Sequence, residues 1–155
     1  MSKYPAAAPL LRELDMQLSV VGPQKGAAAA IKMIRSVMIK GIEALTLECF
    51  LAASRAGVLD EVTASLKNNY PGLDWPAMSE YNLERMVSHG ERRAAEMEES
   101  AATLRELGLD PLMVDATIRR QRETGAVGKE EAVRAAIEQG RAALLAAIDS
   151  AKDRH

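Results

Sequence analysis

The chain has 155 residues, 48% of them hydrophobic and only 3% aromatic, and its 20 Lys and Arg against 22 Asp and Glu leave a formal net charge of -2. This length favours one compact domain, and a core filled by Ala, Leu, Ile, Val and Met is typical of a helical bundle. The near-neutral charge gives no electrostatic reason to expect binding to nucleic acid or to an anionic membrane.

The first 23 residues predict a short helix over 6–14 and then a single strand over 16–21, before the turn at Gly22-Pro23. A lone strand cannot pair its own backbone groups. It must therefore pair with another chain, lie as extended coil, or remain from a sheet whose other strands are absent. We favour the last interpretation and assign residues 1–23 to such a remnant.

Residues 24–56 predict one long helix of about nine turns, ending at Gly57. Because this segment is apolar nearly all round, we expect it to be the buried axis of the domain. One apolar stripe is formed by Ile34, Met38, Gly41, Leu45, Cys49 and Ala52. The helix is interrupted by the charged residues Lys32, Arg35, Lys40, Glu43 and Glu48.

The rest of the chain also predicts helices, over 59–68, 74–107, 111–123 and 129–151, with a break at 125–128. Asp74 can cap the second of these helices, and Gly90 is a possible kink within it. The expected fold class is therefore mainly α, a multi-helix bundle around a long axial helix with one short N-terminal strand, and residues 24–155 form its helical domain.

Metal binding, secretion and membrane insertion are not expected. The single cysteine, Cys49, and the histidines His89 and His155 do not form a cluster with metal-ligand spacing. Glu13 and Asp15 occupy the region where a signal peptide needs an apolar run, and no later segment has about 18 uncharged apolar residues. We therefore expect a cytoplasmic protein.

The sharpest local feature lies at the start of the long helix, where Lys32 and Ser36 share one face of the segment 26–36. An ammonium group on a helix built for burial is unfavourable unless it faces a cleft or a partner. The alternative is that the Lys32 side chain extends to solvent from the helix end.

The segment 26–36, continued by 40–45, Glu48 and 52–58, resembles the start of the C-terminal domain of the β-hydroxyacid dehydrogenases. That family includes the 3-hydroxyisobutyrate and 6-phosphogluconate dehydrogenases. The later segments 89–99 and 107–111 look more like one poorly characterised bacterial branch of it. The resemblance covers residues 16–124.

The resemblance implies a two-domain enzyme, in which a Rossmann domain binds NAD or NADP and the helical domain completes the substrate cleft and forms a homodimer. Residues 1–23 would then be the last pieces of the Rossmann domain. The chain has no Gly-x-Gly-x-x-Gly after a strand, so we expect no cofactor-binding residue in it and no turnover by it alone.

By the same resemblance, Lys32 is the catalytic general acid/base that takes the proton from the substrate hydroxyl. Ser36 stands where the family usually has a substrate-binding Asn, and Ala28 stands where it has a second glycine. Ser keeps a donor and an acceptor but reaches less far than Asn.

Arg92 and Arg93 are the candidates for binding the substrate carboxylate, on the turn before Glu96. The alternative is that Arg92 and Glu96 form an ordinary surface pair four residues apart. His89 could face the cleft, although a lone histidine near a kink is more often on the surface. We interpret Glu48 as a structural acceptor.

Two functional hypotheses remain open. The first is the substrate-binding and dimerisation domain of an NAD(P)-dependent oxidoreductase that acts on a small β-hydroxy acid. The second is a non-catalytic helical dimerisation or interaction module that has kept the fold. Both predict a homodimer.

Overall fold

The computed structural model describes residues 4–14 and 24–154, and the backbone alone for residues 4–8. The chain divides into two compact units, residues 1–32 and 33–155. The first unit contains helix α1 (Tyr4–Glu13) and the start of helix α2 (Ala27–Arg55), which continues into the second unit. The expected strand over 16–21 and the domain boundary after residue 23 lie outside the described residues.

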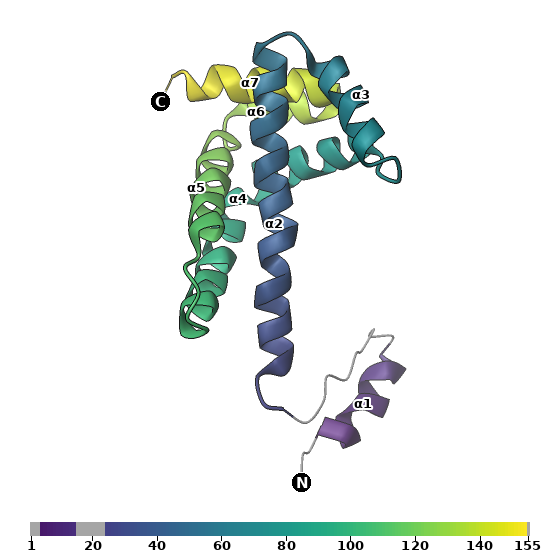
Figure 1. Cartoon of the computed structure of the whole chain (residues 1–155), viewed down its shortest axis with the longest axis vertical. Coiled ribbons are helices and arrows are strands. Elements are labelled where there is room, and N and C mark those ends of the chain that lie inside the picture. Colours follow the sequence, from purple (N-terminus) through teal and green to yellow (C-terminus); the bar gives the residue numbers. More distant parts are fainter. Residues whose placement is uncertain (1–3, 15–23, 155) are drawn as a thin grey trace. The chain divides into compact units, whose positions relative to one another are not determined.

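Every regular element within the described residues is helical, which confirms the mainly α fold class (Figure 1). After α2 the chain forms α3 (Leu59–Asn69), α4 (Trp75–Glu106), α5 (Leu112–Val127), α6 (Glu131–Ala136), the short 3-10 helix η1 (Ile137–Gln139) and α7 (Arg141–Lys152). In these same residues no helix is long and apolar enough to cross a membrane.

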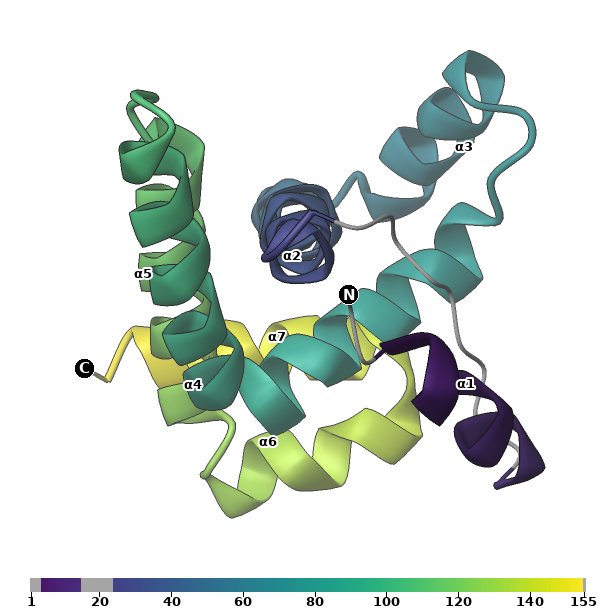
Figure 2. The same ribbon diagram turned by 90° about the horizontal axis from the view of Figure 1, so that it is seen from below.

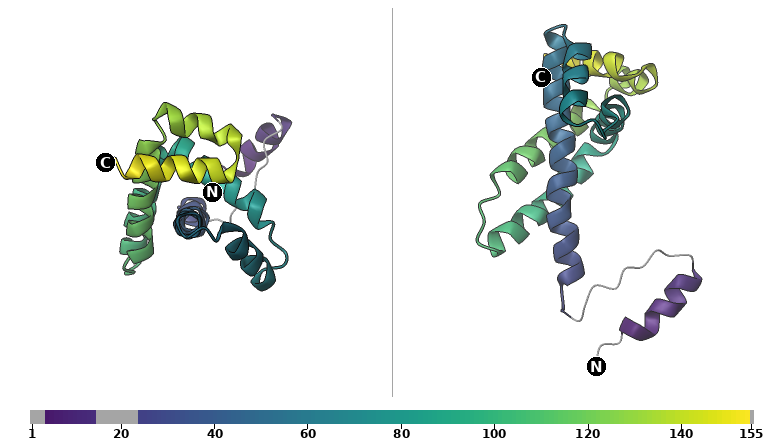
Figure 3. Two further views of the ribbon diagram at one scale, coloured as in Figure 1. Left: turned by 90° about the horizontal axis from the view of Figure 1, so that it is seen from above. Right: turned by 45° about the vertical axis from the view of Figure 1, so that its right-hand side comes forward.

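Helices α4 and α5 lie side by side over much of their length, and α6 and α7 lie together at one end of the second unit (Figures 1 and 3). At the start of α4 the Asp74 carboxylate accepts a hydrogen bond from Ala77 N at 3.1 Å, as the sequence predicts for a capping residue. The ribbon of α4 changes direction along its length (Figure 2).

Two hydrophobic clusters hold the second unit together. The larger is centred on residues that are almost completely buried, among them Leu47, Phe50, Leu83, Met86, Leu145 and Ile148. The smaller joins α4 to α5 and contains Ala94, Met97, Ala101, Val114 and Ile118. The small side chains on α4 alternate with large ones, which allows the close helix packing that the sequence pattern predicts.

The long helix α2 presents a different face to the core from the one expected. The face that is buried carries Ser36, Lys40, Glu43, Thr46, Leu47 and Phe50. Most of the predicted apolar stripe is exposed instead, with Met38 64% and Leu45 65% accessible, while Gly41 and Cys49 are half-buried. Figure 2 looks along α2 and shows α3, α4, α5 and α7 around part of it only. The prediction that this stripe is buried within the chain is therefore wrong.

The C-terminal region also differs from the expectation. Helix α5 continues through Gly125 to Val127, so the predicted break at 125–128 falls mostly inside it. The helix expected over 129–151 is divided at Gly140, whose φ of 91° lies in the left-handed region. Only glycine adopts this conformation without strain. The backbone at Gly140 thus turns α7 back beside α6.

Candidate functional site

A buried polar cluster joins α2 to α4 in the second unit. The Lys40 side chain is only 8% exposed, and its Nζ lies 3.0 Å from Glu96 Oε2. The same Nζ donates a hydrogen bond of 3.4 Å to Ser36 Oγ, one helical turn earlier. Arg92 donates to the other carboxylate oxygen of Glu96. These four residues form a continuous chain from Ser36 on α2 to Arg92 on α4.

Glu96 is the shared acceptor of this cluster. Burial favours its neutral form, but the hydrogen bond and charge of Lys40, together with the charges of Arg92 and Arg93, outweigh burial and lower the pKa of Glu96 below 4.5. Glu96 is therefore a carboxylate at neutral pH. Its negative charge compensates that of Lys40, which lies in a position where an unpaired ammonium would be strongly unfavourable.

Arg93 belongs to a second buried group. Its Nε donates to Glu43 Oε2 at 2.9 Å, and its Nη2 donates to the other oxygen of the same carboxylate. The Arg93 and Glu43 side chains are 6% and 1% exposed. Gln121 Nε2 on α5 also donates to Glu43 Oε2 at 2.9 Å. The carboxylate of Glu43 thus ties α2, α4 and α5 together.

The predicted site residues therefore lie in different surroundings. Ser36 is buried beside Lys40, Arg92 is exposed and pairs with Glu96, and Arg93 is buried against Glu43. Lys32 is an exposed residue of α2 within the first unit. Its catalytic role and the substrate-binding roles of the other three stay predictions.

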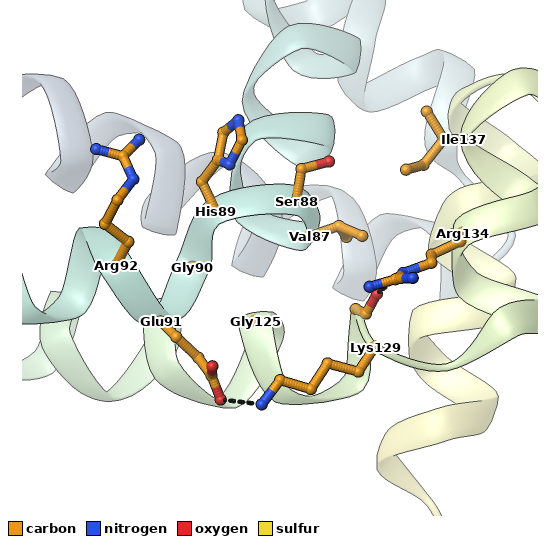
Figure 4. A pocket seen from close by; sticks show the side chains of 11 residues that line it. Val87, Ser88, His89, Gly90, Glu91, Arg92, Gly125, Lys129, Arg134 and Ile137 are labelled. Carbon is orange, nitrogen blue, oxygen red and sulfur yellow. Dashed lines mark hydrogen bonds and ion pairs between the residues drawn. The ribbon is translucent and has the colours of Figure 1, made fainter.

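Arg92 also lies at the edge of a pocket of about 630 Å³ between α4 and residues 125–137 (Figure 4). Val87, Ser88 and His89 line it from α4, while Lys129, Arg134 and Ile137 line it from the other side. Lys129 Nζ donates a hydrogen bond of 2.8 Å to Glu91 Oε1. His89, for which the sequence left a cleft or a surface position open, therefore lines a pocket.

The site does not have the features of a metal centre or of a dinucleotide cradle. Among the described residues no group of three or more His, Cys, Asp or Glu could hold a metal ion. The described residues also lack a strand, so they offer no strand-turn-helix unit to hold a pyrophosphate.

The sequence did not show that Lys40, Glu43 and Gln121 would be buried with polar partners. Lys40 and Glu43 were noted only as charged residues on an apolar helix. Their spacing was the available signal. Ser36, Lys40, Glu43 and Thr46 follow one another at intervals of three or four residues, so they share one helix face. Glu48, interpreted as an acceptor, does pair with Arg120, but its side chain is 64% exposed.

The helical fold of the chain is similar to the helical domain of the 3-hydroxyacid dehydrogenases. Residues 53–124 match the family model described as "Domain of unknown function (DUF1932)". Together with the structural likeness described below, this match confirms the resemblance to the C-terminal helical domain of the 3-hydroxyacid dehydrogenases.

The solved structures that are similar to the chain include the following two. A conserved hypothetical protein from Sinorhizobium meliloti 1021 is 36% identical with a TM-score of 0.83, over 95% of this chain and 48% of that protein. A conserved protein of unknown function, described as structurally similar to 3-hydroxyacid dehydrogenases, is 31% identical with a TM-score of 0.65, over 77% of this chain and 47% of that protein.

A curated relative of Methanothermus fervidus is described as an uncharacterized 28.5 kDa protein in the 7S RNA 5' region. It is 27% identical over 108 residues, which cover 70% of this chain and 43% of that protein. The chain thus spans less than half the length of each of these three proteins.

Proposed function

We propose that this domain binds substrate and forms the dimer in an NAD(P)-dependent oxidoreductase that acts on a small β-hydroxy acid. The observation that carries the proposal is the 31% identity and common fold with a protein described as similar to 3-hydroxyacid dehydrogenases. NAD or NADP would be held by a nucleotide-binding domain, because the described residues do not form a cradle for it. When bound there, the nicotinamide would supply the hydride acceptor.

In this proposal Lys32 takes the proton from the substrate hydroxyl, and Ser36 and an arginine hold the substrate. The environments of Arg92 and Arg93 favour Arg92 for the carboxylate. Arg93 already directs two N–H groups at buried Glu43, whereas the Arg92 side chain is 60% exposed. Guanidinium groups with free N–H donors bind carboxylates well.

The dimer is supported by the exposed apolar face of the second unit. On α2 this face contains Ile34, Met38, Ile39, Ile42 and Leu45, and on α5 it contains Leu112 and Met113. Leu45 and Met113 line one shallow pocket between the two helices, so the two sets are adjacent. A contiguous apolar surface of this kind marks a protein interface, and we propose a second copy of the chain as the partner.

The enzymatic proposal can be tested by replacing the matching helical half of the Sinorhizobium meliloti protein with residues 24–155. Oxidation of a panel of small 3-hydroxy acids would be followed by nicotinamide absorbance with NAD and with NADP. We expect turnover that Lys32→Ala abolishes and Lys25→Ala preserves. Both lysines are exposed, but the family resemblance implies a catalytic role for Lys32 alone. A folded fusion without turnover would favour the non-catalytic interaction module.

The dimer is tested separately by sedimentation of the chain. We expect a dimer that Met38→Glu combined with Leu45→Glu converts to a monomer, because two carboxylates would enter an apolar interface. Tyr81→Glu is the matched control, since Tyr81 is 59% exposed and belongs to α4, which contributes no residue to this face. A wild-type monomer at all concentrations would contradict the dimer.

A further inference from the structure

The pocket between α4 and residues 125–137 contains polar groups that have no partner within the described part of the chain. Arg134 Nε donates to Gly128 O at 3.2 Å, which fixes the guanidinium at the pocket wall. Its two terminal nitrogens form no ion pair or hydrogen bond with the described residues. The same holds for the side chains of Ser88 and His89, which project from α4 (Figure 4).

The charges around the pocket leave a positive surplus. Glu91 is the only acid in the lining, and its carboxylate is 2.8 Å from Lys129 Nζ. Arg92 shares Glu96, which is not part of the lining, with Lys40. Among the described lining residues Arg134 forms no ion pair with an acid, so its positive charge adds to the surplus. A guanidinium held through Nε still presents its two terminal nitrogens, which is the geometry that binds an oxyanion.

The shape of the pocket fits a small organic molecule better than a single ion. Its floor contains Gly90, Gly125 and Gly128, so no side chains fill it. Val87 and Ile137 add apolar wall. A volume of about 630 Å³ lies within the range of about 300–1,000 Å³ usual for ligand pockets. The carbon part of a ligand can pack on the apolar wall while its charge faces Arg134.

We propose that this pocket binds a small organic oxyanion, a phosphate monoester or a carboxylate, with Arg134 as the anchor and with Ser88 and His89 as further donors. Lys32 and Ser36 do not line this pocket, whereas Arg92, proposed above to hold the substrate carboxylate, lies at its edge. The anchor proposed here is Arg134, which has no part in the proposed function. It remains a valid proposal if the chain proves to be a non-catalytic module.

The test is a titration of the full chain with inorganic phosphate, glycerol phosphate and malonate, followed by backbone amide NMR shifts. We expect saturable shifts confined to residues 87–92 and 125–137 with at least one probe. Tighter binding of glycerol phosphate than of malonate would identify a phosphate site, and the reverse order a carboxylate site. Tighter binding of glycerol phosphate than of inorganic phosphate would show that the apolar wall contributes.

Arg134→Gln should weaken binding by about tenfold or more, because a charge-assisted hydrogen bond is lost. The matched control is Arg122→Gln, an exposed arginine of α5 that pairs with Glu98 and lies outside the pocket. A second variant, Ser88→Glu, keeps Arg134 but places a carboxylate in the pocket, and it should also abolish binding. The proposal is overturned if no probe gives saturable shifts, or if Arg122→Gln weakens binding as much as Arg134→Gln.

Discussion

Gly90 of α4 and Gly125 of α5 meet backbone to backbone. A Cβ placed on Gly90 would lie 2.7 Å from Gly125 N and 2.8 Å from Gly125 Cα, and one placed on Gly125 would lie 2.5 Å from Glu91 N. Real Cβ atoms do not approach backbone atoms so closely. The two helices can therefore pack at this distance only because both positions are glycine. The same contact leaves the floor of the pocket without side chains.

Gly90→Ala should consequently destabilise the fold by about 3 kcal/mol or more, since the obstructing atoms are backbone and cannot rotate away. Urea unfolding followed by circular dichroism measures the change. Gly72→Ala is the control, because a Cβ at Gly72 meets no atom within 4 Å and its φ is not in the left-handed region. That variant should remain within about 1 kcal/mol of the wild type. Equal stability of the two variants would contradict the close contact.

The buried Glu43 and Arg93 pair gives a second prediction. Arg93→Met leaves the Glu43 carboxylate buried without its cation, which should lower the free energy of unfolding by about 3–5 kcal/mol. Arg92→Met removes the neighbouring charge from an exposed position and should change it by less than about 1 kcal/mol.

The double variant Glu43→Gln with Arg93→Met should recover part of the loss, because the amide oxygen still accepts from Gln121 and neither residue of the pair then carries a charge. These three variants are compared by urea unfolding. If Arg93→Met proved no more destabilising than Arg92→Met, Arg93 would be free for a substrate and its proposed structural role would be wrong.

Glu96 makes the stability of the chain depend on acid pH. Its folded-state pKa is lowered below the ordinary 4.5, so its pairing with Lys40 and Arg92 contributes stability above about pH 4.5. This contribution is lost as the pH falls through the folded-state pKa, because the protonated carboxyl no longer attracts the two cations. Glu96→Gln should therefore lose less stability on acidification than the wild type. The measurement is the urea concentration at the unfolding midpoint, compared between neutral and acid pH.

The control for this pH dependence is Glu99→Gln, an exposed acid of the same helix that forms no ion pair within the described residues. It should keep the acid sensitivity of the wild type. An unchanged pH profile in Glu96→Gln would show that the Lys40 contact does not stabilise the fold.

The sequence predicted most of the helices because their signals are local. The cap at Asp74, the turn after Asn69 and the apolar periodicity of α4 all depend on residues close in the chain. It could not predict which face of α2 would be buried, since that depends on the partners. Lys40 and Glu43 are favourable inside because Glu96 and Arg93 on α4 supply opposite charges.

The candidate site was predictable only in part for the same reason. The resemblance identified Lys32, Ser36, Arg92 and Arg93 by position along the chain. The difference between Arg92 and Arg93 arises from helix geometry, which turns adjacent residues about 100° apart and directs Arg93 at α2 while Arg92 faces solvent. Two neighbouring arginines thus have different surroundings, which the sequence alone could not show.

The fold departs most clearly from the sequence prediction at Gly140. Periodicity over 129–151 predicts one helix, yet Gly140 has φ 91° and ψ 175° and places α7 beside α6.

Gly140→Ala would favour the continuous helix but strain this turn by about 1–3 kcal/mol. The burial of Val133, Leu144 and Ile148 in the core depends on the turn. We therefore expect lower stability in urea without a gain in helicity by circular dichroism, whereas the neighbouring Gln139→Ala should be nearly neutral. Higher stability together with greater helicity in Gly140→Ala would instead mean that α6 and α7 can join into one helix.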